Sequence, residues 1–458
     1  MFEQPLAPHA GDGLRRVLDD RLVGELEASI ARLRRVLAGR ALWHVNSTGV
    51  GGGVAEMLTT LLPYLRAAGI SVHWAVIEGD SDFFRVTKRL HNWLHEQPGD
   101  NGDLGPAERA TYEATLLAQA AGLMARVRPG DLVVLHDPQT AGLAPLLADR
   151  DVRVVWRCHI GTDDPAELAR AAWNFLRTDV DRADALVFSR AAYAWDGLAN
   201  VTVITPCIDM LSPKNAPFAQ PAARAMLTAA GLLECNGAAP EEPTGRPATI
   251  LGGLRVPVDA PLVLQVSRWD RLKGSAGVIA AFDEAWVTGG VHLMVAGPEI
   301  GTISDDPESA DAFATVKRAW EQLSAKARRH VHVASLPMDD PTANARLVNA
   351  LQRHAAVVAQ KSVQEGFGLT VAEAMWKERP VVATRVGGIQ DQIVHGKNGL
   401  LVDDPHDLGA FADAVTTLLR DSQLALEIGG AARERVCEHF LPAHHFAAEA
   451  SLFERITA

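Results

Sequence analysis

The chain has 458 residues, 48% of them hydrophobic, and a formal net charge of −12 at pH 7. This length exceeds one typical core and predicts two domains, and the composition is ordinary for a soluble globular protein. The negative charge argues against a broad nucleic-acid surface. No apolar run reaches the ~18 residues needed to cross a bilayer, so no stable membrane association is expected.

The amino-terminal residues and the cysteines bear on the compartment. Met1 to Gln4 contain no basic region followed by an apolar one, so no signal peptide is visible. The four cysteines lack paired metal-ligand spacing, and we interpret them as reduced thiols: Cys158, Cys207, Cys235 and Cys437. Together these features predict a cytoplasmic protein.

Residues 12–38 predict an amphipathic helix, because leucines recur there near helical spacing. This helix is expected to pack within its domain or to form an oligomer contact, so a homodimer stays open. Strands and helices then alternate, as in a parallel sheet with crossover helices. The predicted strands of this first set lie at residues 41–45, 72–77, 132–135, 152–156, 185–188 and 201–204.

A second alternating set predicts another domain. Its strands are expected at residues 262–266, 291–295, 331–333, 357–358, 381–383 and 399–402. Residues 213–260 are rich in Ala, Pro and Gly and are expected to include a linker. The prediction is therefore an α/β protein with two doubly wound domains facing a central cleft, at 1–212 and 213–440, followed by a helix at 441–458.

A glycine-bearing turn follows the first strand and opens a helix. It runs from Asn46 to Glu56, and Gly51, Gly52 and Gly53 permit a tight turn and close backbone approach to a diphosphate. The turn does not match G-x-G-x-x-G, and no clear acidic ribose partner follows. A plain connecting loop is the alternative.

Polar side chains also follow later strands of the first set. Asp137 and Gln139 come just after one strand, where they can hydrogen-bond a sugar, although Asp137 alternatively caps a helix. His159 ends another strand and is expected to point into the cleft. Three polar residues at one-turn spacing on a helix either join this site or form a solvated face: Lys88, His91 and Asn92.

Basic residues follow the first strand of the second set. Arg268 and Lys273 place two positive charges at a strand end, with Arg271 a weaker candidate. Such cations stabilise negative charge that develops on a leaving phosphate in the transition state. Leu336 ends a later strand, where its backbone is a candidate contact for a nucleobase.

The most informative run joins a buried strand to a helix. Glu365 and Glu373 lie eight positions apart (373 − 365) across a turn that contains Gly366 and Gly368. A helix start favours phosphate, and ligands bind at the carboxyl ends of strands in open α/β sheets. Two carboxylates beside it suggest a sugar nucleotide, with Glu365 on the sugar and Glu373 on the ribose. A surface Glu followed by an ordinary helix Glu is the alternative.

This run resembles the E-x7-E signature of the family 4 retaining glycosyltransferases, which have the two-domain GT-B fold. The resemblance includes the flanking residues 360–362, 374–376 and 387–388 and extends roughly from Trp43 to Pro405. Segments 45–58, 74–77, 83–92, 136–139 and 155–161 resemble the trehalose-forming synthases and trehalose phosphorylases in particular. The resemblance also implies that a carboxy-terminal helix, here residues 441–458, crosses back to the first domain.

The resemblance implies a retaining transfer of glucose from an NDP-glucose to glucose, giving α,α-trehalose. UDP-, ADP- and GDP-glucose all stay open as the donor substrate. The implied catalytic residues are His159, Arg268, Lys273 and Glu365. The implied donor-binding residues are Gly52, Gly53, Arg268, Lys273, Leu336, Glu365, Gly366, Phe367, Gly368, Leu369, Thr370 and Glu373. The implied acceptor-binding residues are Asn46, Glu56, Lys88, His91, Asn92, Asp137 and Gln139.

Two routes are open for the transfer. Glu365 is a nucleophile candidate by its chemistry, but its family position contacts sugar hydroxyls, which favours front-face departure and attack. No essential metal or cofactor is expected, and the acidic pairs 305–306, 339–340 and 403–404 are interpreted as solvated loop acids. The alternatives are trehalose phosphorylase, a transferase with another small hydroxylated acceptor, a sugar-nucleotide epimerase and a non-catalytic sensor.

Overall fold

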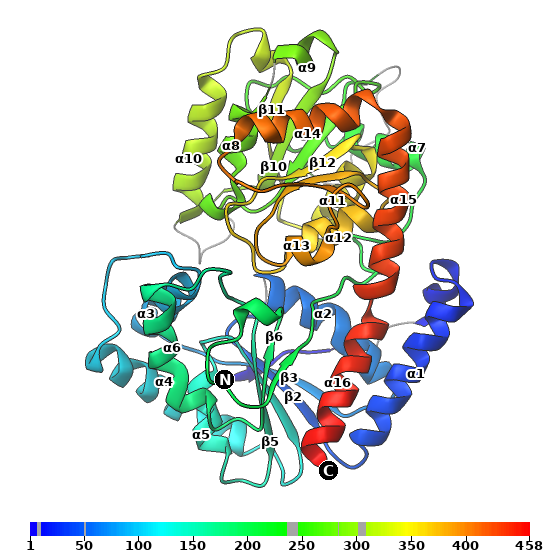
Figure 1. Ribbon diagram of the computed structural model, residues 1–458. Helices are drawn as coiled ribbons and strands as arrows, with labels where there is room; N and C mark the ends of the chain where they lie inside the picture. The colour runs from blue at the N-terminus through cyan, green and yellow to red at the C-terminus, as the bar shows by residue number, and fades with distance from the viewer. Residues whose placement is uncertain (7–10, 50–51, 236–245, 283, 301–307) are drawn as a thin grey trace. The chain divides into compact units, whose positions relative to one another are not determined.

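The computed structural model describes residues 1–6, 11–49, 52–235, 246–282, 284–300 and 308–458 (Figure 1). The chain divides into two compact units, Met1–Asp209 with Phe440–Ala458, and Met210–His439. The sequence placed these divisions at 212/213 and 440/441. Within the described ranges, no helix combines the length and apolar character needed to span a bilayer.

The first unit is built on a seven-stranded sheet with the order β1-β3-β2-β4-β5-β6-β7. Only β1 is antiparallel, on β3, and the other pairs are parallel. The strands are β1 (Phe2–Glu3), β2 (Leu42–Asn46), β3 (Val72–Val76), β4 (Leu132–His136), β5 (Arg153–Cys158), β6 (Ala185–Phe188) and β7 (Val201–Val203). The helices are α1 (Asp20–Val36), α2 (Gly52–Ala67), α3 (Ser81–Leu94), α4 (Pro106–Met124), α5 (Ala144–Leu147), α6 (Glu167–Val180) and α16 (Pro442–Thr457).

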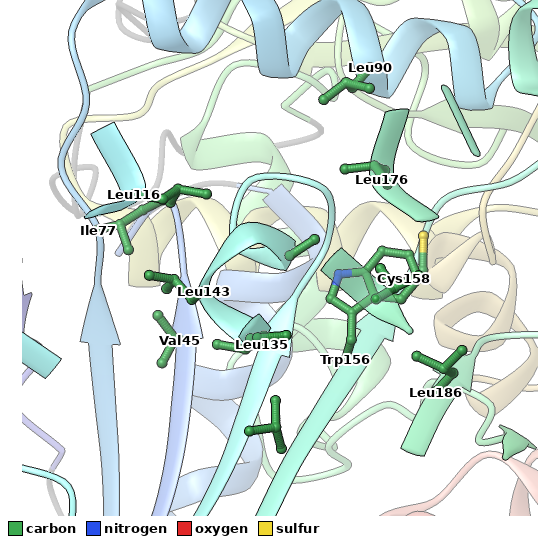
Figure 2. Packing of buried hydrophobic residues seen from close by; sticks show 14 of the residues in the cluster. Val45, Ile77, Leu90, Leu116, Leu135, Leu143, Trp156, Cys158, Leu176 and Leu186 are labelled. Carbon is green, nitrogen blue, oxygen red and sulfur yellow. The ribbon is translucent and has the colours of Figure 1, made fainter. Parts of the chain in front are cut away.

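Side chains alternate across this sheet, so each face has its own core. Figure 2 shows part of one core, where Val45, Leu135 and Trp156 from the strands meet Leu116 of α4 and Leu176 of α6. The opposite face packs against α1, α2 and α16 through a second buried apolar cluster. Both faces are covered, which explains why the strands read as continuous apolar runs.

The two terminal helices of the first unit pack against each other. The sequence predicted one helix over 12–38, but α1 begins at Asp20, because Asp19 caps it by accepting the amide of Leu22 at 2.8 Å. A 3₁₀ helix precedes it at Gly11–Arg16. Arg32 of α1 donates to Glu454 of α16, with 2.7 Å between Nε and Oε1. The carboxy-terminal helix is therefore part of the first unit.

The second unit has a seven-stranded sheet with the order β14-β13-β12-β9-β10-β11-β8. Its strands are β8 (Thr249–Ile250), β9 (Leu262–Val266), β10 (His292–Pro298), β11 (Val331–Leu336), β12 (Val357–Gln360), β13 (Val381–Thr384) and β14 (Leu400–Val402). Its helices are α7 (Gln220–Ala229), α8 (Ser275–Ala280), α9 (Glu284–Thr288), α10 (Glu308–Glu321), α11 (Pro341–His354), α12 (Leu369–Trp376), α13 (Ile389–Gln392), α14 (Leu408–Arg420) and α15 (Ser422–His439).

The stretch expected to include a linker, 213–260, largely belongs to this unit. It contains α7, which packs on α11, and β8, which pairs antiparallel with β11. Ala223 and Leu227 of α7 are fully buried, so this helix is held by apolar burial that the Ala- and Pro-rich composition concealed. Residues 236–245 of the stretch lie outside the described residues.

Both sheets reverse their strand order at one place. In the first unit this switch lies between β2 and β4, and in the second unit between β9 and β12. The loops on either side of such a point diverge and leave a crevice at the carboxyl ends of the strands. Asn46, Asp137, Lys273 and Glu365 lie at or after the ends of strands that meet at these two points, whereas His159 follows β5 and Leu336 ends β11.

Candidate active site residues

In the second unit, a buried glutamine joins the two loops at the switch point. The side chain of Gln265, on β9, donates to the carbonyl of Lys273 at 2.8 Å and accepts the amide of Lys361 at 3.0 Å. Gly274 has φ of 62°, and a Cβ there would lie 2.0 Å from the Lys361 carbonyl oxygen. Glycine is therefore required for this close approach of the loop after β9 to the loop after β12.

Lys273 and Glu365 form an ion pair at this point, although 92 residues separate them in the chain (365 − 273). Lys273 Nζ lies 2.6 Å from Oε1 and 2.7 Å from Oε2 of Glu365. Their side chains are 17% and 8% exposed. Ser362 donates its hydroxyl to Glu365 Oε2 at 3.1 Å and is itself held by Gln360 at 2.9 Å. The structure thus brings together two of the residues predicted to act on the donor.

The glycine turn between Glu365 and α12 is held by hydrogen bonds from the segment that contains Gly388 and Gln392. The Gly366 carbonyl accepts the amide of Gly388 at 3.0 Å, and the Phe367 carbonyl accepts Gln392 Nε2 at 2.5 Å. A Cβ on Gly388 would lie 2.7 Å from Phe367 Cα, which explains the glycine there. Gly368 has φ of 86° and is the N-cap residue that precedes α12.

The first turn of α12 presents backbone amides to any ligand at the switch point. Leu369 and Thr370 are its first two residues, and both are partly exposed. The first amides of a helix have no acceptor within the helix and favour an anion. This part of the turn therefore suits a phosphate.

Glu373 lies one turn into α12 and is buried, at 3% exposed. Its Oε1 is 3.6 Å from Lys214 Nζ, and its carbonyl accepts from Lys377 Nζ at 3.0 Å. Burial lowers the pKa of Lys377 to about 7. Glu373 is thus a buried carboxylate beside the ammonium of Lys214, a neighbour that the sequence did not reveal.

Two other predicted donor residues are not part of the Lys273–Glu365 ion pair. Arg268 is half exposed, and its Nη2 is 3.7 Å from Asp270 Oδ2. Leu336 ends β11, with β10 between it and β9, and its carbonyl accepts the amide of Glu299 at 2.9 Å. A nucleobase contact at Leu336 would use the remaining lone pair of that carbonyl.

In the first unit, His159 and Asp137 are joined at the ends of neighbouring strands. Asp137 Oδ1 accepts the amide of His159 at 2.7 Å, and the Asp137 amide donates to the Arg157 carbonyl at 2.8 Å. Asp137 is a non-glycine residue with φ of 62°, a conformation that aspartate tolerates better than most residues. Burial raises the pKa of Asp137 to about 7. His159 Nε2 lies 3.0 Å from Nδ1 of His136.

The start of α2 is open, but Asn46 beside it is already engaged. Gly52 has φ of 76°, and a Cβ on Gly52 or Gly53 would meet no heavy atom within 4 Å. The Asn46 side chain accepts from Trp74 Nε1 at 2.8 Å and donates to the Thr48 carbonyl at 2.7 Å. Asn46 therefore ties the loop to β3 in this structure. Glu56 is exposed on α2, and residues 50 and 51 lie outside the described residues.

The remaining acceptor candidates lie on α3 and after β4. Lys88 is exposed, and His91, Asn92 and Gln139 are partly exposed. His95, at the end of α3, donates Nδ1–H to the Gly161 carbonyl at 3.0 Å, so α3 is tied to the loop that follows His159. The side chain of His95 therefore connects the end of α3 to the segment that follows His159.

Metal ligation was not expected from the sequence. The described ranges contain no group of three His, Cys, Asp or Glu side chains that could hold a metal ion. Asp339 and Asp403 are exposed and face Arg246 and Arg385. The pair 305–306 lies outside the described residues.

Sequence reasoning missed the residues that support the predicted ones. Gln265, Ser362, His44 and His136 are buried polar side chains within or just after strands. The sequence did mark them, because each is a polar residue inside or directly after an apolar strand run. A polar side chain at such a position is buried only when it is hydrogen-bonded.

Comparison with known proteins agrees with the architecture. Residues 44–195 match the family model described as trehalose synthase, N-terminal domain, and residues 250–435 match glycosyl transferases group 1. The chain is 35% identical to the trehalose synthase of Rubrobacter xylanophilus, covering 96% of both chains. It is 34% identical to that of Pyrococcus horikoshii, covering 94% of both. It is 27% identical to a trehalose phosphorylase of Pleurotus pulmonarius over 86% of this chain and 54% of that protein.

Solved structures share the fold at lower identity. A UDP-forming α,α-trehalose-phosphate synthase from Burkholderia vietnamiensis superposes with a TM-score of 0.67 at 16% identity, covering 90% of this chain and 96% of that one. Sucrose-phosphate synthase from Thermosynechococcus elongatus superposes with a TM-score of 0.64 at 19% sequence identity, covering 91% of this chain and 98% of that one. The predicted GT-B fold is thereby confirmed.

Proposed function

Because the chain belongs to the trehalose synthase family of GT-B glycosyltransferases, we propose that it transfers glucose from an NDP-glucose to glucose with retention, forming α,α-trehalose and NDP. The observation that carries this proposal is the Lys273–Glu365 pair at the β9/β12 switch point. It sets a cation and a carboxylate side by side, as a phosphate and a neighbouring sugar require.

In the proposed reaction, the bond between glucose C1 and the β-phosphate oxygen breaks, and the acceptor hydroxyl oxygen bonds to C1 on the same face. The acceptor proton passes to the leaving phosphate oxygen. Lys273, Arg268 and the first amides of α12 stabilise the negative charge on that phosphate. Glu365 accepts hydrogen bonds from the sugar, and Glu373 accepts from the ribose.

The first-unit residues hold the sugars in this proposal. His159 supports the reacting glucose, while Asp137 and Gln139 follow β4 and bind the acceptor, together with the polar face of α3. No metal is needed, since Lys273 and Arg268 supply the positive charge that a divalent cation would otherwise provide.

Product analysis by NMR tests the proposal. Purified protein is given ADP-, UDP- or GDP-glucose, each with and without glucose. We expect trehalose and free NDP only when both substrates are present. Trehalose from glucose 1-phosphate and glucose without nucleotide would instead show a phosphorylase, and isomerisation of the donor alone would show an epimerase. Either result, or the absence of any disaccharide, would refute the proposal.

A further inference from the structure

Three histidines on neighbouring strands of the first unit form a continuous chain of ring contacts. Nδ1 of His44 lies 3.0 Å from Nε2 of His136, and Nδ1 of His136 lies 3.0 Å from Nε2 of His159. The successive ring planes are inclined by only 24° and 16°. His44 and His136 are buried, and His159 is partly exposed just after β5.

The parallel register of the sheet explains this chain. His44 on β2 lies opposite Val134 on β4, and His136 lies opposite Arg157 on β5. Residues two apart on a strand share a face, so each histidine lies one strand across and two residues further along than the one before. The chain therefore runs diagonally from the core to the carboxyl edge of the sheet, where His159 ends it.

Burial favours the neutral form of all three rings. Burial lowers the pKa of His44 to about 4 and lowers the pKa of His136 and His159 well below the ordinary value. A neutral imidazole has one N–H and one lone pair, so each contact needs an N–H on one ring and a lone pair on the other. Only two patterns satisfy both contacts: Nδ1–H on all three rings, or Nε2–H on all three.

The inner end of the chain distinguishes these patterns. Nε2 of His44 and Nε of Arg157 are both buried without a hydrogen-bond partner in the described part of the chain. The guanidinium can only donate, and its positive charge acts on His44, so it favours a lone pair at His44 Nε2. Glu449 acts on the pKa of His44 in the opposite direction and more strongly than Arg157, but this effect concerns the charged ring, and its Oε1 is already shared by His445 at 3.2 Å and Arg157 at 3.4 Å. The pattern with Nδ1–H on every ring follows.

We propose that His44 and His136 are positioning residues that hold His159 as its Nδ1–H tautomer, so that His159 donates this N–H to a hydroxyl of the bound sugar. The proposal rests on the transferase function proposed above, in which His159 supports the reacting glucose. Buried hydrogen-bond partners are a general means of fixing the tautomer and orientation of a working imidazole.

The second unit contains a matched control. His292 Nδ1 lies 2.9 Å from His332 Nε2, and His332 donates Nδ1–H to the Leu254 carbonyl at 3.0 Å. His292 is buried, and burial lowers its pKa to about 4, as for His44. It stands at the amino end of β10, the opposite end from the switch-point residues. Replacing it removes a buried histidine contact without touching the His159 chain.

Imidazole ¹⁵N NMR of histidine-labelled protein tests the proposal, because protonated and unprotonated ring nitrogens have well-separated shifts. In the wild-type protein, we expect His159 to be protonated on Nδ1. In His44→Leu, we expect a mixture of His159 tautomers and a loss of about tenfold in kcat. His44→Asn, whose amide can donate to His136, should restore both the tautomer and most of the turnover.

His292→Leu should lose stability comparably, with an unchanged His159 tautomer and an unchanged kcat. The proposal is overturned if wild-type His159 carries its proton on Nε2, or if His44→Leu leaves the His159 tautomer as it was. The wild-type spectrum decides the first point even if His44→Leu does not fold. The tautomer is read without substrate, so an enzyme that makes no trehalose would refute the proposed function while leaving this measurement decisive.

Discussion

Replacing Lys273 with methionine removes the charge of the switch-point ion pair while keeping an unbranched side chain of similar length. In the proposed reaction, Lys273 stabilises the charge that develops on the leaving phosphate. Losing one such contact raises the barrier by ~3 kcal/mol, which corresponds to about a hundredfold lower rate. We therefore expect kcat in Lys273→Met to fall by about that factor.

The same change should also lower stability. Glu365 is only 8% exposed, and in Lys273→Met its buried carboxylate would keep Ser362 but lose its cation. Removing one partner of a buried pair destabilises a protein by about 3–5 kcal/mol, and the 17% exposure of Lys273 places this case at the lower end. Urea unfolding should therefore show a free energy of unfolding lower by ~3 kcal/mol.

A double variant separates the two effects. In Lys273→Met with Glu365→Gln, no charge is left unpaired, and the amide oxygen can still accept the Ser362 hydroxyl. Most of the stability should return, while the rate should stay low because both functional groups are absent. Lys317→Met is the control, since Lys317 pairs with Glu321 at 3.8 Å on an exposed helix face and should change neither property measurably.

Trehalose formation is measured at saturating donor and at a temperature where each variant is folded. The reasoning about Lys273 is refuted if folded Lys273→Met turns over within about twofold of the wild type. The account of stability is refuted if the double variant is no more stable than Lys273→Met.

Three further predictions concern the loop contact, the pH dependence and metal removal. In urea unfolding, Gly274→Ala should lower the free energy of unfolding by at least ~1–2 kcal/mol, because alanine is strained at the positive φ of this position. Gly430→Ala is the control: the space around Gly430 in α15 is open, so this variant should lose no stability in the same assay. Because the pKa of Asp137 is raised from 3.8 to about 7 in the folded protein, its contribution to stability is complete below pH 4 and is lost as pH rises to 7, by up to about 4 kcal/mol. Asp137→Asn keeps a side-chain oxygen that can accept the His159 amide, but it should flatten the dependence of the unfolding free energy on pH between 4 and 7. An unchanged dependence would contradict the raised pKa of Asp137. EDTA should leave trehalose formation unchanged, and a loss restored by Mg²⁺ would contradict the role given to Lys273.

Local patterns in the sequence were sufficient for the fold class, and they predicted candidate site residues at the ends of strands. Strands of each sheet were predicted from short apolar runs, because burial on both faces removes polar residues from them. The GT-B fold and the family resemblance are confirmed. The two-residue edge strands β1 and β8 were not predicted, since so short a segment becomes a strand only by pairing with a sheet already formed.

The contacts between distant segments were decided by the tertiary structure alone. Glu365 was predicted to bind a sugar and Lys273 a phosphate, but their pairing depends on β9 and β12 being neighbours at the switch point. The helix predicted over 12–38 was shortened by a cap at Asp19, and α7 emerged from a stretch expected to include a linker.

The histidine chain shows most clearly the difference between what local sequence patterns predict and what tertiary structure decides. The sequence placed His44 in a strand, His136 directly after a strand and His159 at a strand end, and of these three it singled out only His159 as a candidate site residue. Their contact requires the order β2-β4-β5 and a register that shifts each ring by two residues. Periodicity along a chain reports which face a side chain occupies. Which strand lies beside it, and in which register, is a property of long-range pairing, and that pairing is what makes three separate histidines into one chain.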